Sequence, residues 1–282
     1  MLKKLSEFFL FSSVFISACS VAMCIETCLL LHIRLNSISF YLFVFSATLV
    51  QYNLHYLVKE SAVKNSQRLS WSFKNKFVHK ILIGFGSVLI IISLFSFQLH
   101  HFIILIIFGA VAFLYSFPIL PFYRQKRIKD FGLLKIITLA LLWTLVTVWL
   151  PADGTIFSGI SFQLIFLRRF IFIFILCLLF DIRDIEIDKA ESIATLAVKL
   201  GLKRSYSLCY TLLIIFVVLC VAEFIYLSDT AQLISMLLSA LATIITIQFS
   251  KKNNSDFVYL ACVDGMMLLQ ALLVIFASVI KL

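Results

Sequence analysis

Apolar stretches of about 20 residues recur along the whole chain, and they constrain its fold more than any other feature. A helix rises about 1.5 Å per residue, so one such stretch can cross the roughly 30 Å hydrocarbon core of a bilayer. With 62% hydrophobic and 13% charged residues over 282 positions, the chain is not a soluble domain. The sequence predicts an all-α, polytopic membrane protein made of a single domain over residues 1–282, because only helices satisfy backbone groups within such separate spans.

Nine membrane spans are predicted from the positions of the apolar stretches and the polar links between them. They cover about residues 8–33, 37–58, 77–97, 102–119, 132–150, 159–180, 206–227, 230–249 and 257–280. Most of the 24 Lys and Arg residues fall in the pieces that share one side with the N-terminus. This asymmetry predicts a cytoplasmic N-terminus and cytoplasmic long loops, and it explains the net charge of +10 without nucleic acid as a partner.

An acidic stretch follows the sixth predicted span. Asp181, Asp184 and Asp188 have offsets of zero, three and seven, which place them on one face of a helix. Its plain interpretation is a solvated helix end, but carboxylates at a helix C-terminus oppose the macrodipole at a cost of about 0.3–1 kcal/mol each. We therefore favour a site for a divalent cation that carries phosphate oxygens.

The same stretch resembles a known signature. It reads Asp181-Ile-Arg-Asp184-Ile-Glu-Ile-Asp188 and is followed by Thr195-Leu-Ala-Val-Lys-Leu-Gly201. This is similar to the second signature of the UbiA family of intramembrane prenyltransferases, DxxDxxxD with a TLxVxLG-like segment. The run Leu114-Tyr-Ser-Phe-Pro118 also resembles the exit from that family's fourth helix, and nine spans fit as well.

The resemblance implies a helical bundle around a central cavity, in which Mg²⁺ holds an isoprenyl diphosphate. The isoprenyl group would pass to an aromatic or lipid-soluble acceptor, as in quinone biosynthesis. The implied catalytic and metal-binding residues are Asp181, Asp184 and Asp188. Basic residues and the metal would stabilise the departing diphosphate. The weaker candidates for substrate binding are Tyr115, Lys126, Arg127 and Lys189.

The first family signature, NDxxDxxxD, is degenerate at the end of the second span. Asn53 is retained, whereas Leu54, Leu57 and Ser61 stand where the family has aspartates. Asn53 is expected to bind substrate and to give the metal one oxygen ligand, since magnesium prefers oxygen. Half of the expected metal site is missing at this point of the chain.

Several polar residues lie at membrane depth, where they are costly and need an explanation. Gln51 and His55 are expected either to bond between helices or to line the cavity. Arg168 and Arg169 lie within the sixth span, and Asp264 lies within the ninth. Asp264 is expected to pair with one of these arginines or, alternatively, to bind an acceptor. The basic and aromatic segment 59–80 is expected to lie on an anionic lipid surface.

The sequence thus predicts a membrane prenyltransferase in a bacterial inner membrane, with its N-terminus and its active-site loops in the cytoplasm. Two alternatives stay open. One is a catalytically degenerate relative that binds a prenyl lipid or quinone or acts as an assembly partner, which the lost aspartates favour. The other is a small cation transporter. Acidic residues at one mouth do not by themselves form a pathway across the membrane, so they give this alternative little support. The sequence is silent on oligomeric state.

Overall fold

The computed structural model describes residues 2–58, 66–95, 97, 99–116, 132–152, 159–190 and 192–280. Every regular element within these ranges is a helix, which confirms the predicted all-α fold class. The first half of the chain forms α1 (Leu2–Phe11), α2 (Val14–Leu30), α3 (Ile38–Val58), α4 (Gln67–Lys74), α5 (Lys76–Leu94) and α6 (Leu99–Ser116). The second half forms α7 (Gly132–Thr144), η2 (Leu145–Trp149), α8 (Ile160–Arg183), α9 (Ile185–Ala190), α10 (Leu196–Leu227), α11 (Thr230–Ser250), α12 (Asp256–Val258), η3 (Tyr259–Val263) and α13 (Gly265–Ile280).

The predicted spans coincide with helices in the described ranges, but the count of nine membrane crossings is not confirmed. Five helical segments are long and apolar enough to span a membrane, and a sixth is added if the bent pair α1–α2 is one span. That pair bends by 58° at a break. Ser13, at the break, has a φ of 68°, so the helix cannot continue through it.

Side-chain caps explain where the later helices begin. Thr195 Oγ1 accepts a hydrogen bond from Val198 N at the start of α10, and Asp229 Oδ1 accepts one from Gln232 N at the start of α11. Such caps satisfy backbone donors that have no partner within the helix. The loops between long helices therefore end at fixed points, which holds neighbouring helices in register.

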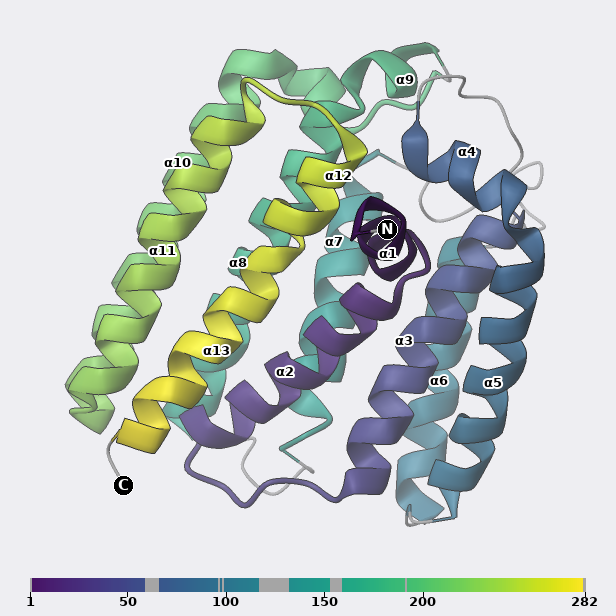
Figure 1. The fold of residues 1–282 in the computed structure, drawn as a ribbon. Helices are drawn as coiled ribbons and strands as arrows, with labels where there is room; N and C mark the ends of the chain where they lie inside the picture. Colours follow the sequence, from purple (N-terminus) through teal and green to yellow (C-terminus); the bar gives the residue numbers. More distant parts are fainter. Residues whose placement is uncertain are drawn as a thin grey trace.

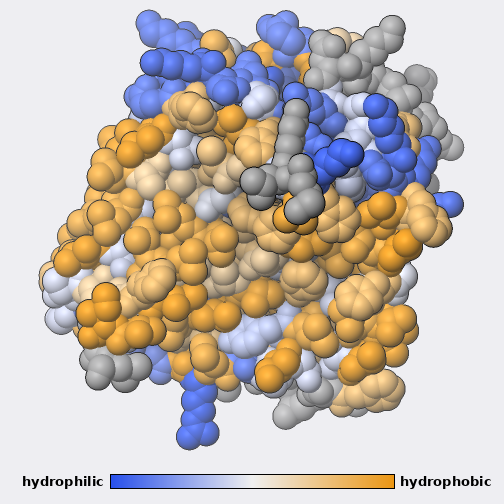
Figure 2. Space-filling view, viewed as in Figure 1, coloured by the Kyte–Doolittle hydropathy of each residue, from blue (hydrophilic) through white to orange (hydrophobic). Residues whose placement is uncertain are grey.

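The long helices form one bundle (Figure 1). The helices α10, α11 and α13 lie on one side of it, and α3, α5 and α6 lie on the other. The main apolar core joins residues of α2, α7, α8, α10, α11 and α13. Figure 2 shows a broad band of apolar side chains around the middle of the molecule, while hydrophilic side chains gather at the end where α4 and α9 lie. A band of this kind suits contact with lipid.

Candidate functional site

A large cavity lies between the two sides of the bundle. Its volume is about 1310 Å³, which exceeds the 300–1,000 Å³ typical of a site for one small molecule. Its walls come from α2, α3, α6, α7, α8 and α13, and its polar end is formed by α4, α9 and α12. The space is therefore large enough for two ligands side by side, with an apolar wall and a charged mouth.

The three predicted aspartates all line this cavity. They do not belong to one uninterrupted helix, because α8 ends at Arg183 and Asp184 adopts a non-helical φ of −91° and ψ of 8°. The short helix α9 then resumes, and Asp188 N donates to Asp184 O at 2.8 Å. Asp181 and Asp188 are 2% and 5% exposed, so their carboxylates face the interior of the protein.

Lys135 of α7 brings two of these acids together. Its Nζ lies 2.7 Å from Asp181 Oδ1 and 3.7 Å from Asp188 Oδ2. Burial raises the pKa of Asp188 to about 6, even though Lys135 favours the ionised form. Lys135 is not among the site residues predicted from the sequence, although a lysine one turn into an apolar span is a signal for an intramembrane partner.

Asp184 faces a different cation. Arg183 Nε and Nη2 donate to its two carboxylate oxygens at 2.7 and 3.1 Å. Arg183 Nη1 also reaches Asp256 Oδ1 at 3.2 Å. Asp256 Oδ2 in turn accepts hydrogen bonds from Ser66 Oγ and Arg68 N, at 2.7 and 2.9 Å. This chain of bonds fastens the start of α4 to α8 and α12 at the mouth of the cavity.

The basic residue Arg68 also lies at this mouth, and its position differs from the one predicted from the sequence. The segment 59–80 was expected to lie on a lipid surface, but Arg68 is only 6% exposed and lines the cavity. The first turn of α4 turns it inward, where its guanidinium lies 4.0 Å from the centroid of the Tyr56 ring. Nη2 donates to Ser13 Oγ at 3.0 Å, and Nε has no hydrogen-bond partner in the described part of the chain.

Asn53 does not join the acidic residues. It is fully buried and is absent from the lining of the large cavity. Its Nδ2 donates to Ser12 O and Leu49 O at 2.9 and 2.8 Å, and its Oδ1 lies 2.5 Å from His79 Nδ1. The amide therefore ties α3 to the α1–α2 break and to α5, and its oxygen is already engaged by a ring nitrogen.

The other predicted substrate-binding residues have different positions. Tyr115 lines the cavity from α6. Lys189 points away, because it pairs with Glu186 at 2.9 Å and its side chain is 52% exposed. Lys126 and Arg127 lie outside the described residues. Gln51 satisfies both expectations for it, since its Nε2 donates to Ala112 O of α6 at 2.7 Å and it also lines the cavity.

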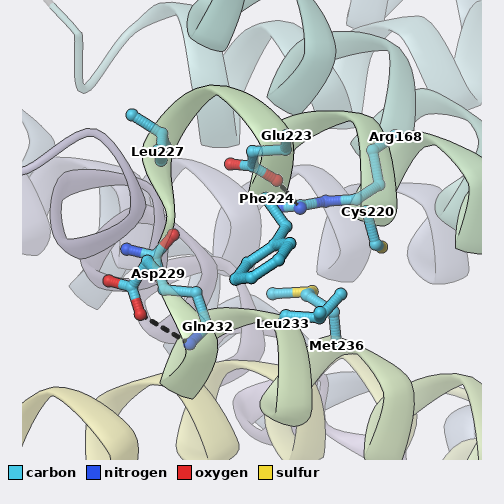
Figure 3. A pocket seen from close by; sticks show the side chains of 9 residues that line it. All are labelled: Arg168, Cys220, Glu223, Phe224, Leu227, Asp229, Gln232, Leu233 and Met236. Carbon is cyan, nitrogen blue, oxygen red and sulfur yellow. Dashed lines mark hydrogen bonds and ion pairs between the residues drawn. The ribbon is translucent and has the colours of Figure 1, made fainter.

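The expected pairing of Asp264 with Arg168 or Arg169 is wrong. Arg169 pairs with Glu26 of α2 at 3.0 Å, and Arg168 forms a very close ion pair with Glu223 of α10. Figure 3 shows Arg168 and Glu223 pointing toward one another beside a small pocket. That pocket has a volume of only about 10 Å³, which is room for roughly one water molecule, so it is not a substrate site.

The acidic residues fit a hard divalent cation. Asp181 Oδ2 and Asp188 Oδ2 are buried without hydrogen-bond partners in the described ranges, and carboxylate oxygens are the ligands that Mg²⁺ prefers. The Lys135 ammonium already lies between these two acids, which shows that their arrangement accepts positive charge. Among the described residues, no three His, Cys, Asp or Glu side chains converge closely enough to hold one metal ion as the structure stands. Binding would therefore require the carboxylates to turn from their present cations.

Comparison with known proteins agrees with this architecture. A family model described as the UbiA prenyltransferase family matches residues 74–257. The chain belongs to the UbiA prenyltransferase family. This match runs from the last residue of α4 to the start of α12 and includes the acidic residues. No curated protein sequence matches the chain.

Solved UbiA-type structures share the fold at low sequence identity. A UbiA homologue from Archaeoglobus fulgidus, bound to GPP and Mg²⁺, is 14% identical with a TM-score of 0.63, covering 97% of this chain and 99% of its own. The apo UbiA homologue from Aeropyrum pernix K1 is 14% identical with a TM-score of 0.61, covering 98% of both chains. A structure described as digeranylgeranylglyceryl phosphate synthase is 17% identical with a TM-score of 0.57 over the whole of both chains.

Proposed function

We propose that this UbiA-family protein transfers an isoprenyl group from an isoprenyl diphosphate to an aromatic or lipid-soluble acceptor. The observation that carries the proposal is the position of Asp181, Asp184 and Asp188 at the charged mouth of an apolar cavity with room for two ligands. The Archaeoglobus fulgidus homologue was solved with GPP or DMAPP together with Mg²⁺, which supports an isoprenyl diphosphate as the donor here.

The three aspartates would hold Mg²⁺, which would neutralise the charge that develops on the diphosphate as it leaves. The buried guanidinium of Arg68 adds a fixed positive charge at the same mouth and forms no ion pair within the described residues. Arg183 holds Asp184 in place, and Asp256 holds the start of α4 against it. The apolar wall keeps water from the isoprenyl carbon, so the acceptor rather than water would attack it.

Orientation follows from the charge distribution rather than from the fold. We propose that the mouth opens to the cytoplasm and that the protein lies in a bacterial inner membrane, because basic residues gather in the links on that side. Both substrates would be amphiphilic or apolar, and the isoprenyl tail would lie along the apolar wall.

A second function is favoured by specific observations. The end of α3 lacks the aspartates of the first family signature, Asn53 faces His79 instead of the cavity, and Lys135 already neutralises two of the remaining acids. A protein of this kind would bind a prenyl lipid or quinone without turnover.

Release of diphosphate separates the two functions. Isolated membranes of the producing cell, which supply lipid-soluble acceptors, are incubated with dimethylallyl, geranyl, farnesyl and geranylgeranyl diphosphates, with and without Mg²⁺. The transferase account predicts Mg²⁺-dependent release that Asp184→Asn abolishes. The matched control is Glu186→Gln, whose side chain is 85% exposed and which should retain release. Tight binding of the donors without release by the wild type would instead establish the lipid-binding function.

A further inference from the structure

Asp264 is a carboxylate inside the large cavity that the proposed diphosphate site does not use. It lines the cavity together with Leu260 and Met267, which lie one turn before and one turn after it. The ion pairs of the described residues engage Asp181, Asp184, Asp188 and Asp256, but not Asp264. Its side-chain oxygens also have no hydrogen bond within the described ranges. An ionisable side chain without an ion pair or hydrogen bond is costly at membrane depth, which favours a role in binding a ligand.

The backbone around Asp264 is unusual as well. The residue directly follows the π-helical segment η3, and its backbone N–H closes that segment by donating to Tyr259 O at 3.0 Å. A π-helical turn inserts one residue into a helix and rotates the residues that follow, and such turns are frequent at functional sites. Here the extra residue sets the direction in which Asp264 meets the cavity.

The depth of Asp264 separates it from the diphosphate end. It lies eight positions after Asp256, which belongs to the charged mouth. At a rise of about 1.5 Å per residue, Asp264 is roughly 12 Å further along the same helical rod. The surrounding wall is apolar and aromatic, and it includes Tyr52 and Trp143, whose Nε1 donates to the Tyr52 hydroxyl at 3.2 Å. Asp264 therefore stands in largely apolar and aromatic surroundings, deeper along its helix than Asp256 but still close enough to Arg68 and Arg183 to feel their charges.

We propose that Asp264 binds the acceptor by accepting a hydrogen bond from a hydroxyl or N–H group on an otherwise apolar, ring-bearing molecule. This inference rests on the proposed function, since it assigns the second half of the cavity to the second substrate. An aromatic ring would pack against Leu260, Met267 and the Tyr52–Trp143 pair. Its single donor group would then be oriented by the carboxylate, and a molecule without a donor would leave that carboxylate unsatisfied. Asp264 thus selects acceptors that carry a donor.

The test compares para-hexylphenol with its methyl ether, para-hexylanisole, because the two probes differ in the hydroxyl donor. Binding to the purified protein is followed by intrinsic tryptophan fluorescence, to which Trp143 in the cavity wall contributes. The wild type should prefer the phenol by roughly 10- to 100-fold, as expected for a hydrogen bond to a charged group. Asp264→Leu should abolish this preference, and Asp264→Asn, which keeps one acceptor oxygen, should retain a smaller part of it.

The control variant is Thr48→Val, which changes another polar residue of the cavity lining and should keep the full preference. No preference in the wild type, or a full preference in Asp264→Leu, would overturn the inference. Thermal unfolding of each variant shows that it is folded. Mg²⁺-dependent release of diphosphate from geranyl diphosphate, by membranes that contain the wild-type protein and lipid-soluble acceptors, is measured in parallel. Absence of this release contradicts the proposed function, whereas the phenol preference tests Asp264 by itself.

Discussion

The buried ion pair between Arg169 and Glu26 offers a quantitative test of how this bundle is held together. The two side chains are 2% and 1% exposed, and Arg169 Nη2 lies 3.0 Å from Glu26 Oε2. At an effective dielectric constant of about 20, the attraction across that distance is about 5.5 kcal/mol. Arg169→Met leaves the Glu26 carboxylate buried without a cation, so we expect the free energy of unfolding to fall by about 3–5 kcal/mol.

The matched control is an ion pair of nearly the same length on the surface. Lys189 Nζ lies 2.9 Å from Glu186 Oε1, but the two side chains are 52% and 85% exposed. Lys189→Met should therefore cost less than about 1 kcal/mol. Replacing both buried partners, with Arg169→Met and Glu26→Leu, should restore most of the stability lost in the single variant, because no charge is then left unpaired.

Reversible unfolding in mixed detergent micelles, followed by circular dichroism, measures these differences. The reasoning would be refuted if Arg169→Met cost no more than Lys189→Met. It would also fail if the double variant were as unstable as the sum of the two single variants, because burial of an unpaired charge would then not be the cause.

Three further predictions concern the charged mouth and its surroundings. Asn53→Leu should lower the free energy of unfolding by about 1–3 kcal/mol, because His79 loses a buried hydrogen-bond partner. The Mg²⁺ concentration for half-maximal diphosphate release should stay unchanged in this variant. A large rise in that concentration would instead identify Asn53 as a metal ligand. Lys135→Met removes the cation between Asp181 and Asp188. Mg²⁺ should therefore raise the melting temperature of this variant more than that of the wild type. An equal rise in the two proteins would argue against a metal at these acids. Burial raises the pKa of Asp188 to about 6 from a usual 3.8. The metal-free protein in EDTA should therefore lose stability as pH rises from about 4 through 6. Asp188→Asn should remove most of this pH dependence of the free energy of unfolding.

Features with a local cause could be predicted from the sequence. The helices follow from the length of the apolar stretches, and the acidic cluster follows from the three- and four-residue spacing of its aspartates. The spacing did not reveal that α8 ends at Arg183, so that Asp184 turns to the neighbouring guanidinium while Asp181 and Asp188 face Lys135.

Features that depend on the packing of distant segments could not be predicted in the same way. Lys135 and Asp181 belong to different helices, and the acids that pair with Arg168 and Arg169 come from α10 and α2. The identity of Asn53 suggested an oxygen ligand, but the direction of its side chain depends on α5, which supplies His79. The inward position of Arg68 depends on where α4 begins, and that point is fixed by the Ser66 cap and its bond to Asp256.

The central claim is that Asp181, Asp184 and Asp188 bind a divalent cation that holds the donor diphosphate. Crystals grown with Mn²⁺ and a non-hydrolysable geranyl thiolodiphosphate test it most directly, because manganese scatters anomalously and also binds oxygen ligands. We predict an anomalous peak bonded to carboxylate oxygens of these aspartates and to the diphosphate, with the geranyl tail along the apolar wall of the cavity. A bound analogue with no metal peak at the aspartates, or a peak held by other residues, would contradict the account.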